Sequence, residues 1–287
     1  MRLDAGTVLL QWAAGGLFFL WVTTRRREVG LGYGWLLRGV FLAMAVAGAW
    51  VIAASDRGGA GAAVSAVGAV AMAFVAAVAL TVSIARRRTG VRGRRARRAE
   101  RAEQVAAMAG RPAHAPRTPD AAAPEFPPVL DLAAAATGLV GLLGAAAYVG
   151  GPYALSAFRL VSGALFFGAL TDAMLLGHWY LVQPGLKRDP LRQMVVLAAV
   201  VWPFEIAAYL WPVGMAQVLD GTVNDGFDGL LGWTWLVCAV TTIALLAVTW
   251  LALRERYYSA VMAATGLLYL AILTGFGTDL IARAVLN

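Results

Sequence analysis

The chain has 287 residues, of which 60% are hydrophobic and 14% are charged, and its mean hydropathy is +0.70. Soluble domains carry roughly 25% charged residues, so this composition excludes a water-soluble fold. The formal net charge of +8 comes almost entirely from arginine, a bias that together with heavy use of alanine indicates a GC-rich bacterial genome. The single Cys238 excludes an intrachain disulfide and a thiolate metal cluster.

Eight apolar stretches follow one another along the chain, each about 20 residues long, the length that crosses a ~30 Å hydrocarbon core as a helix. Backbone amides within a membrane must be paired inside the protein, and these stretches are too long for barrel strands of ~10 residues. The sequence therefore predicts an all-α, polytopic integral membrane bundle of about eight transmembrane helices. The predicted helices are 6–23, 36–54, 60–85, 129–149, 155–182, 191–214, 229–252 and 258–282.

The first stretch has its arginines after the apolar segment, whereas a signal peptide has them before it, so we expect a retained membrane helix. After the third helix the chain becomes rich in arginine and then in proline, which predicts a short helix followed by a disordered linker. The chain is thus divided into 1–85 with three helices, the 86–128 linker, and 129–287 with five helices. For the linker we favour contact with anionic lipid headgroups over nucleic-acid binding.

Basic residues lie almost entirely in alternate connections between the predicted helices. Of the 24 Lys and Arg residues, all but Arg2, Arg57, Arg159 and Arg283 fall in the first, third, fifth and seventh connections. The positive-inside rule makes these connections cytoplasmic and places both termini outside. We therefore expect a bacterial inner (plasma) membrane protein whose basic linker is cytoplasmic.

Short matches between the two parts of the chain indicate an internal repeat. Because the repeat unit has four helices, an even number, both halves would share one orientation, as in transporters with parallel repeats. Chance matches among Ala, Gly and Leu residues are the competing explanation. The matching segments are 15–19 with 163–167, Arg38 and 52–54 with Arg192 and 206–208, and 136–139 with 264–267.

Four ionisable residues lie within apolar stretches, where their cost makes them candidates for a proton relay or a substrate site: Arg159, Asp172, His178 and Glu205. Measured from the adjoining ends of their helices, Asp172 and Glu205 differ in depth by only about 6 Å, so we expect them to meet near the midplane. Such a pair could share a proton. The alternative is that protonated or hydrogen-bonded carboxyl groups hold helices together.

Two prolines interrupt the sixth stretch, Pro203 and Pro212, and each predicts a kink or break. An opened turn beside Glu205 would resemble the discontinuous helices that line transporter sites. His178 precedes Trp179 and Tyr180, a pattern typical of an interfacial aromatic belt. His178 could instead carry protons or hydrogen-bond a quinone head group.

Three functions remain open from the sequence. The first is a proton-linked small-molecule transporter or permease that uses Asp172, Glu205 and His178. The second is a quinone-interacting membrane subunit of a redox complex, and the third is a membrane scaffold or assembly protein, with a membrane-protein partner or homo-oligomer in either case. We expect no cofactor and no metal, because His114 in the linker is the only other histidine, and we read the 220–228 loop as a plain acidic turn.

Overall fold

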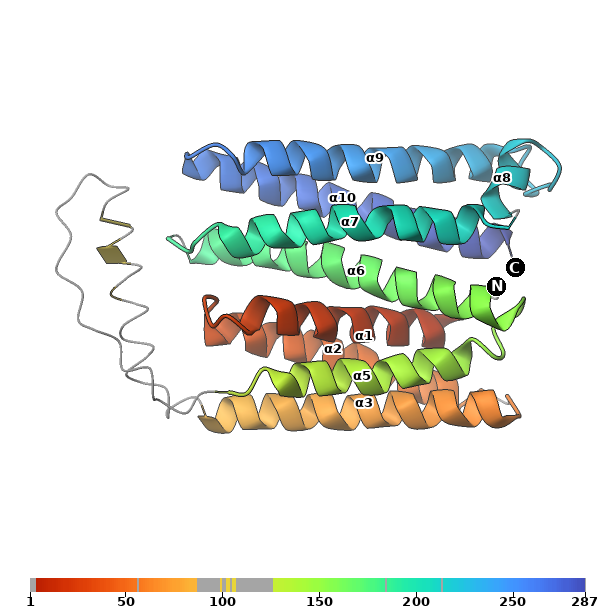
Figure 1. The fold of residues 1–287 in the computed structure, drawn as a ribbon, viewed down its shortest axis with the longest axis horizontal. Helices are drawn as coiled ribbons and strands as arrows, with labels where there is room; N and C mark the ends of the chain where they lie inside the picture. The colour runs from red at the N-terminus through yellow and green to blue at the C-terminus, as the bar shows by residue number, and fades with distance from the viewer. Residues whose placement is uncertain are drawn as a thin grey trace.

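The computed structural model describes residues 4–55, 57–86, 126–183, 185–212 and 214–286, together with residues 99, 102, 103, 105 and 106. Within this part of the chain every regular element is an α-helix, and the long helices lie side by side along one axis (Figure 1). Most of the predicted 86–128 linker lies outside the described residues. The helices are α1 Ala5–Thr24, α2 Leu31–Ala53, α3 Ala60–Ala85, α5 Val129–Ala145, α6 Tyr153–Val182, α7 Asp189–Leu210, α8 Gly214–Leu219, α9 Leu230–Ala252 and α10 Tyr258–Val285.

The predicted helical membrane bundle is confirmed. Seven of the described helices are long and apolar enough to cross a membrane, and α5 is an eighth apolar helix of 17 residues. It is shorter than predicted because the chain turns after Ala145 and reaches positive φ at Gly150 and Gly151. The six-residue α8 was not predicted, since the sixth apolar stretch was taken as continuous to residue 214. The chain is therefore a multi-pass membrane protein.

The long helices form two rings of four. In the first ring α1, α2, α3 and α5 each pack against the next and α5 returns to α1, while α6, α7, α9 and α10 form a ring of the same order (Figure 1). The rings meet mainly where α1 packs against α6. The matching order of neighbours is what a four-plus-four repeat predicts, although the repeat itself stays a hypothesis.

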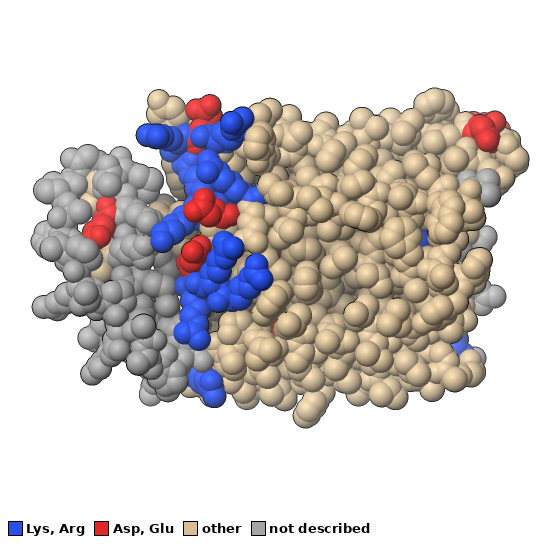
Figure 2. Space-filling model, viewed as in Figure 1, with Lys and Arg blue, Asp and Glu red and all other residues tan. Residues whose placement is uncertain are grey.

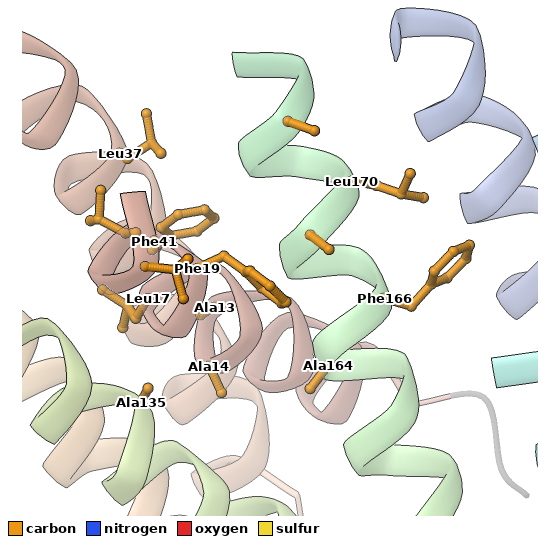
Figure 3. Packing of buried hydrophobic residues seen from close by; sticks show 14 of the residues in the cluster. Ala13, Ala14, Leu17, Phe19, Leu37, Phe41, Ala135, Ala164, Phe166 and Leu170 are labelled. Atoms are coloured by element: carbon orange, nitrogen blue, oxygen red, sulfur yellow. The ribbon is translucent and has the colours of Figure 1, made fainter. Parts of the chain in front are cut away.

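Close backbone contact at the α1 and α6 seam depends on glycine. A Cβ atom on Gly15 would lie 1.6 Å from the backbone oxygen of Ala164, and one on Gly168 would lie 2.2 Å from the backbone carbon of Gly15. Figure 3 shows Ala164 of α6 pointing toward α1, while Leu17 lies on the side of α1 away from α6. These two helices are the most buried of the long apolar helices, so the seam forms the centre of the bundle.

Charged side chains gather at the ends of the bundle (Figure 2). Lys and Arg cover the end that carries the turns after α1, α6 and α9, where Arg25, Arg26, Arg254 and Arg256 are exposed. Both termini and α8 lie at the opposite end (Figure 1). We call these the basic end and the terminal end. The face between them in Figure 2 shows almost no charged side chain, as expected of a surface that contacts lipid.

Candidate functional site

The register between α6 and α7 sets the depth of the predicted site residues. The Ser162 hydroxyl donates to Glu205 Oε2 at 2.7 Å, and Arg159 Nε donates to the Ala208 carbonyl at 2.8 Å. At the turn between the helices, the Tyr180 hydroxyl donates to the Lys187 carbonyl. The same antiparallel register places Asp172 level with Val195.

Asp172 and Glu205 therefore do not meet, contrary to the expectation from sequence. Glu205 lies ten residues beyond Val195, which corresponds to about 15 Å along the helix. The sequence estimate took residues 182 and 191 as level, whereas α7 begins at Asp189 and is displaced along α6. The two carboxyl groups occupy different depths, with Glu205 nearer the terminal end.

Glu205 belongs to a polar cluster buried between the two rings, which we call the α6–α10 cluster. Asp279 of α10 is the central acceptor, since Tyr209 OH donates to its Oδ1 at 2.5 Å and Arg283 Nε donates to its Oδ2 at 2.6 Å. Arg283 also donates to Gln11 Oε1, which ties α10 to α1 of the other ring. The members are Gln11, Arg159, Ser162, Glu205, Tyr209, Asp279 and Arg283, and all are buried.

The Glu205 carboxyl group is only partly satisfied. Besides the bond from Ser162 to Oε2, it lies close enough to Asp279 and Arg283 to interact electrostatically with both. Among the residues that the structure describes, none donates a hydrogen bond to Oε1. Arg283 Nη1 and Trp235 Nε1 are likewise buried, and neither donates to an acceptor among the described residues. Glu205 thus lies near a second carboxyl group, and its Oε1 has no donor among the described residues.

Arg159 caps the end of α7. Pro212 has no N–H, so the carbonyl of Ala208, four residues earlier, loses its helical donor. Arg159 Nε replaces that donor, and Arg159 Nη2 donates to the Trp211 carbonyl at 3.3 Å. The guanidinium also lies where the helix dipole favours a positive charge. Arg159 therefore has a structural role within the cluster.

The two prolines of this region behave differently. α7 ends at Leu210 just before Pro212, as the missing N–H requires. The predicted break at Pro203 is wrong, because α7 continues through that residue. Pro203 is exposed on the outer face of the helix, and membrane helices accommodate such prolines through small local adjustments. No opened turn lies beside Glu205 in the described helix.

Gly163 gives the cluster room for Gln11. A Cβ atom at this position would lie 1.8 Å from Gln11 Nε2 and 3.4 Å from Asp279 Oδ1. The Gln11 amide nitrogen instead reaches the Arg159 carbonyl at 3.4 Å. Because Gly163 of α6 has no side chain, the Gln11 side chain of α1 can enter the second ring.

Sequence reasoning missed five members of the cluster, namely Gln11, Ser162, Tyr209, Asp279 and Arg283. Asp279 and Arg283 lie in the last turns of α10, and Arg283 was counted as a residual basic residue outside the membrane. Their spacing of four, which places opposite charges on one helix face, was the available signal. Gln11 carries no charge, so the search for ionisable residues passed over it.

A second buried ion pair joins helices of the first ring. Arg38 of α2 forms a bidentate pair with Asp131 of α5, with Nε and Nη2 at 2.8 and 2.6 Å from the carboxylate oxygens. Arg38 also donates to Ser83 Oγ of α3 at 3.2 Å, and its guanidinium lies 3.9 Å from the centre of the Phe126 ring. Every strong donor is paired here, so we assign this group to helix packing.

Asp172 and His178 lie apart from each other on α6. Asp172 is fully buried, whereas His178 is exposed and about 240° further round the helix. His178 Nδ1 lies 3.2 Å from the Tyr269 hydroxyl on α10, and the two rings meet edge to face. The structure therefore does not connect His178 with Asp172.

Among the described residues, no group of three or more His, Cys, Asp and Glu side chains is arranged to hold a metal ion. Comparison of the chain with models of protein families, with curated protein sequences and with solved structures gave no match. Evidence for the function of the protein therefore comes from the geometry of its buried polar groups.

Proposed function

We propose that this multi-pass membrane protein is a proton-linked transporter or permease in which Glu205 binds the exchanging proton. The burial of the Glu205 carboxyl group beside Asp279, with no hydrogen bond to its Oε1 from the described residues, is the observation that carries this proposal. Two ionised carboxylates in contact repel each other, so a buried pair of this kind holds a proton. Tyr209 and Arg283 both donate to Asp279, whereas Ser162 alone of the described residues donates to the Glu205 carboxyl group, so we assign the exchanging proton to Glu205.

Loss of that proton would change the charge balance of the cluster. With Glu205 protonated, Arg159 and Arg283 outnumber the one carboxylate, and with Glu205 ionised the charges balance. The groups that feel this change lie on α1, α6, α7 and α10, and Gln11 and Arg283 bridge the two rings. A charge change at a contact between two helix bundles can shift an equilibrium between two arrangements of those bundles.

The orientation that we propose follows from the charges at the two ends. The basic end faces the cytoplasm of a bacterial cell and contacts anionic headgroups, and both termini face outward. Glu205 lies five residues before the end of α7, about 8 Å from the terminal end of that helix. Glu205 would then exchange its proton with the outer side.

A second candidate is interaction with a quinone. The exposed pair of His178 and Tyr269 favours it, because a hydroxyl and an imidazole on a lipid-facing surface can hydrogen-bond the carbonyls of a lipid-soluble head group. Binding of a soluble quinone analogue to purified protein, compared with His178→Phe, tests this candidate. Unchanged binding in the variant would rule out this pair as the site.

Solute uptake into proteoliposomes driven by an imposed proton gradient tests the transport proposal. We expect one member of a panel of amino acids, sugars, organic acids and inorganic ions to accumulate with wild-type protein and not with Glu205→Gln. Asp228→Asn is the matched control, since it neutralises an exposed carboxyl group in the loop before α9 and leaves the cluster intact. Folded wild-type protein that moves neither protons nor any of these solutes would favour a scaffold in which the cluster only holds helices together.

A further inference from the structure

Asp172 is a second buried carboxyl group in α6, and the α6–α10 cluster does not include it. Its side chain is fully buried, and neither carboxylate oxygen receives a hydrogen bond from the residues described. The Tyr33 hydroxyl of α2 donates to the backbone carbonyl of Asp172, at 3.5 Å, and not to the carboxyl group. An ionised carboxylate without donors in an apolar interior is strongly disfavoured, so this side chain is stable there as the neutral acid.

Three protonatable side chains lie between Asp172 and the basic end. Tyr33 interacts electrostatically with both Asp172 and Tyr180, and Tyr180 interacts in turn with Glu28 in the turn between α1 and α2. Tyr33 and Tyr180 are buried, and Glu28 Oε2 is a buried oxygen to which no described residue donates. Tyr180 lies eight residues after Asp172 on α6, about 12 Å closer to the basic end. Tyr33 and Tyr180 are thus buried protonatable side chains on the side of Asp172 that faces the basic end.

The other charged groups around Asp172 are already neutralised or distant. Asp131 of α5 is the carboxylate that acts on Asp172, and Arg38 of α2 pairs with it. On α7 the charged residues are Asp189 and Arg192 at the basic end and Glu205 about 15 Å toward the terminal end. The α1 helix carries no charged residue, and Asp279 and Arg283 of α10 belong to the α6–α10 cluster.

We propose that Asp172 is a second proton-binding position that exchanges its proton with the basic end of the bundle through Tyr33, Tyr180 and Glu28. This inference rests on the proposed function, because proton-linked transport is the process that would use the proton bound at Asp172. Glu205 then serves the terminal end and Asp172 the basic end, on opposite sides of the point where α1 and α6 are in closest contact. The ligand at both positions is a proton.

Infrared spectroscopy of the protein in lipid bilayers tests whether Asp172 holds an exchangeable proton. We expect a carbonyl-stretching band of a protonated carboxyl group at neutral pH that is absent in Asp172→Asn and displaced in Asp172→Glu. In D₂O the wild-type band should shift to lower frequency, because the carboxyl proton is replaced by deuterium. A missing band would show an ionised side chain, and a band that does not shift would show a sealed structural acid. Either result overturns the proposal.

The path is tested by the rate of that exchange. Tyr33→Phe should keep the band and slow its shift in D₂O by about tenfold or more, because it removes a proton-transfer group. Tyr148→Phe is the matched control, since its hydroxyl bonds Ser65 between α3 and α5 in the other part of the first ring. Equal rates in wild type and Tyr33→Phe would overturn the path. Failure here with solute uptake still dependent on Glu205 would leave the proposed function intact.

Discussion

Several arginine side chains in this bundle act on helix ends. Arg159 donates to the carbonyls of Ala208 and Trp211 after α7, and Arg192 donates to the Leu253 carbonyl after α9 at 3.1 Å. Carbonyls at a helix terminus have no donor within the helix, and a membrane offers little water to replace one. A buried arginine in a membrane protein can therefore serve to cap a helix end, and its presence does not by itself indicate a substrate site.

At the residue scale, Asp4 gives a prediction of pH dependence. It caps α1 by accepting the Thr7 amide at 3.1 Å, and Arg57 pairs with it at 2.9 Å. Burial raises the pKa of Asp4, but the hydrogen bond and charge of Arg57 and the amides of Thr7 and Gly6 lower it more, so its pKa lies below 3.8. Because the pKa is depressed by folding, the stabilisation is present above the ordinary pKa and is lost as the pH falls through the folded value.

Asp4→Asn should thus lower the free energy of unfolding in detergent by roughly 1 kcal/mol at pH 7, because asparagine can still cap the helix but loses the ion pair with Arg57 and the favourable negative charge at the helix N-terminus. The difference from wild type should shrink as the pH falls below 3.8. Asp228→Asn, at an exposed position in the loop before α9, should be indistinguishable from wild type. A difference for Asp4→Asn that stays constant with pH would show that ionisation of Asp4 does not contribute.

At the scale of helices, glycine determines how closely the two rings approach. Gly15→Ala would place a methyl group 1.6 Å from the backbone of Ala164, which α1 and α6 can only relieve by moving apart. Since interior packing is dense and backbone cannot shift as a side chain does, we expect strong destabilisation, on the order of several kcal/mol. Thermal unfolding in detergent measures the effect.

Gly39→Ala is the matched control for that substitution. No atom outside its own helix lies within 4 Å of a Cβ added at Gly39 of α2, so alanine should be neutral or stabilise by up to ~1 kcal/mol through helix propensity. Equal thermal stability of the Gly15→Ala and Gly39→Ala variants would contradict the close approach of α1 and α6.

The helices were predictable from sequence because a membrane span is a local property of about 20 residues. The register of neighbouring helices was not, since it depends on where each helix begins around the turn near residue 184. That error put Asp172 level with a residue close to Glu205. The Asp279 and Arg283 pair was missed because Arg283 falls one residue beyond the predicted helix 258–282, so Asp279 within that helix was not recognised as half of an ion pair. The break predicted at Pro203 was wrong because composition does not reveal that this proline lies on the exposed face of α7.

At the scale of the whole molecule, the charges of the two ends predict the orientation. In a Cys238→Ala background, Thr222→Cys at the terminal end should react with a membrane-impermeant maleimide on intact cells. Arg26→Cys at the basic end should react only after the membrane is permeabilised. Both residues are exposed, so the comparison isolates the side of the membrane. The reverse pattern would show that the termini are cytoplasmic.

If protons cross the bundle by way of Glu205, proton flux through the protein depends on the Glu205 carboxyl group. Proteoliposomes enclosing a pH-sensitive dye would be exposed to an imposed proton gradient, with wild type, Glu205→Gln and Glu205→Asp incorporated in equal amounts. The account predicts rapid acidification with wild type, a return to the lipid background with Glu205→Gln, and partial flux with Glu205→Asp. Equal flux in wild type and a folded Glu205→Gln variant would contradict it.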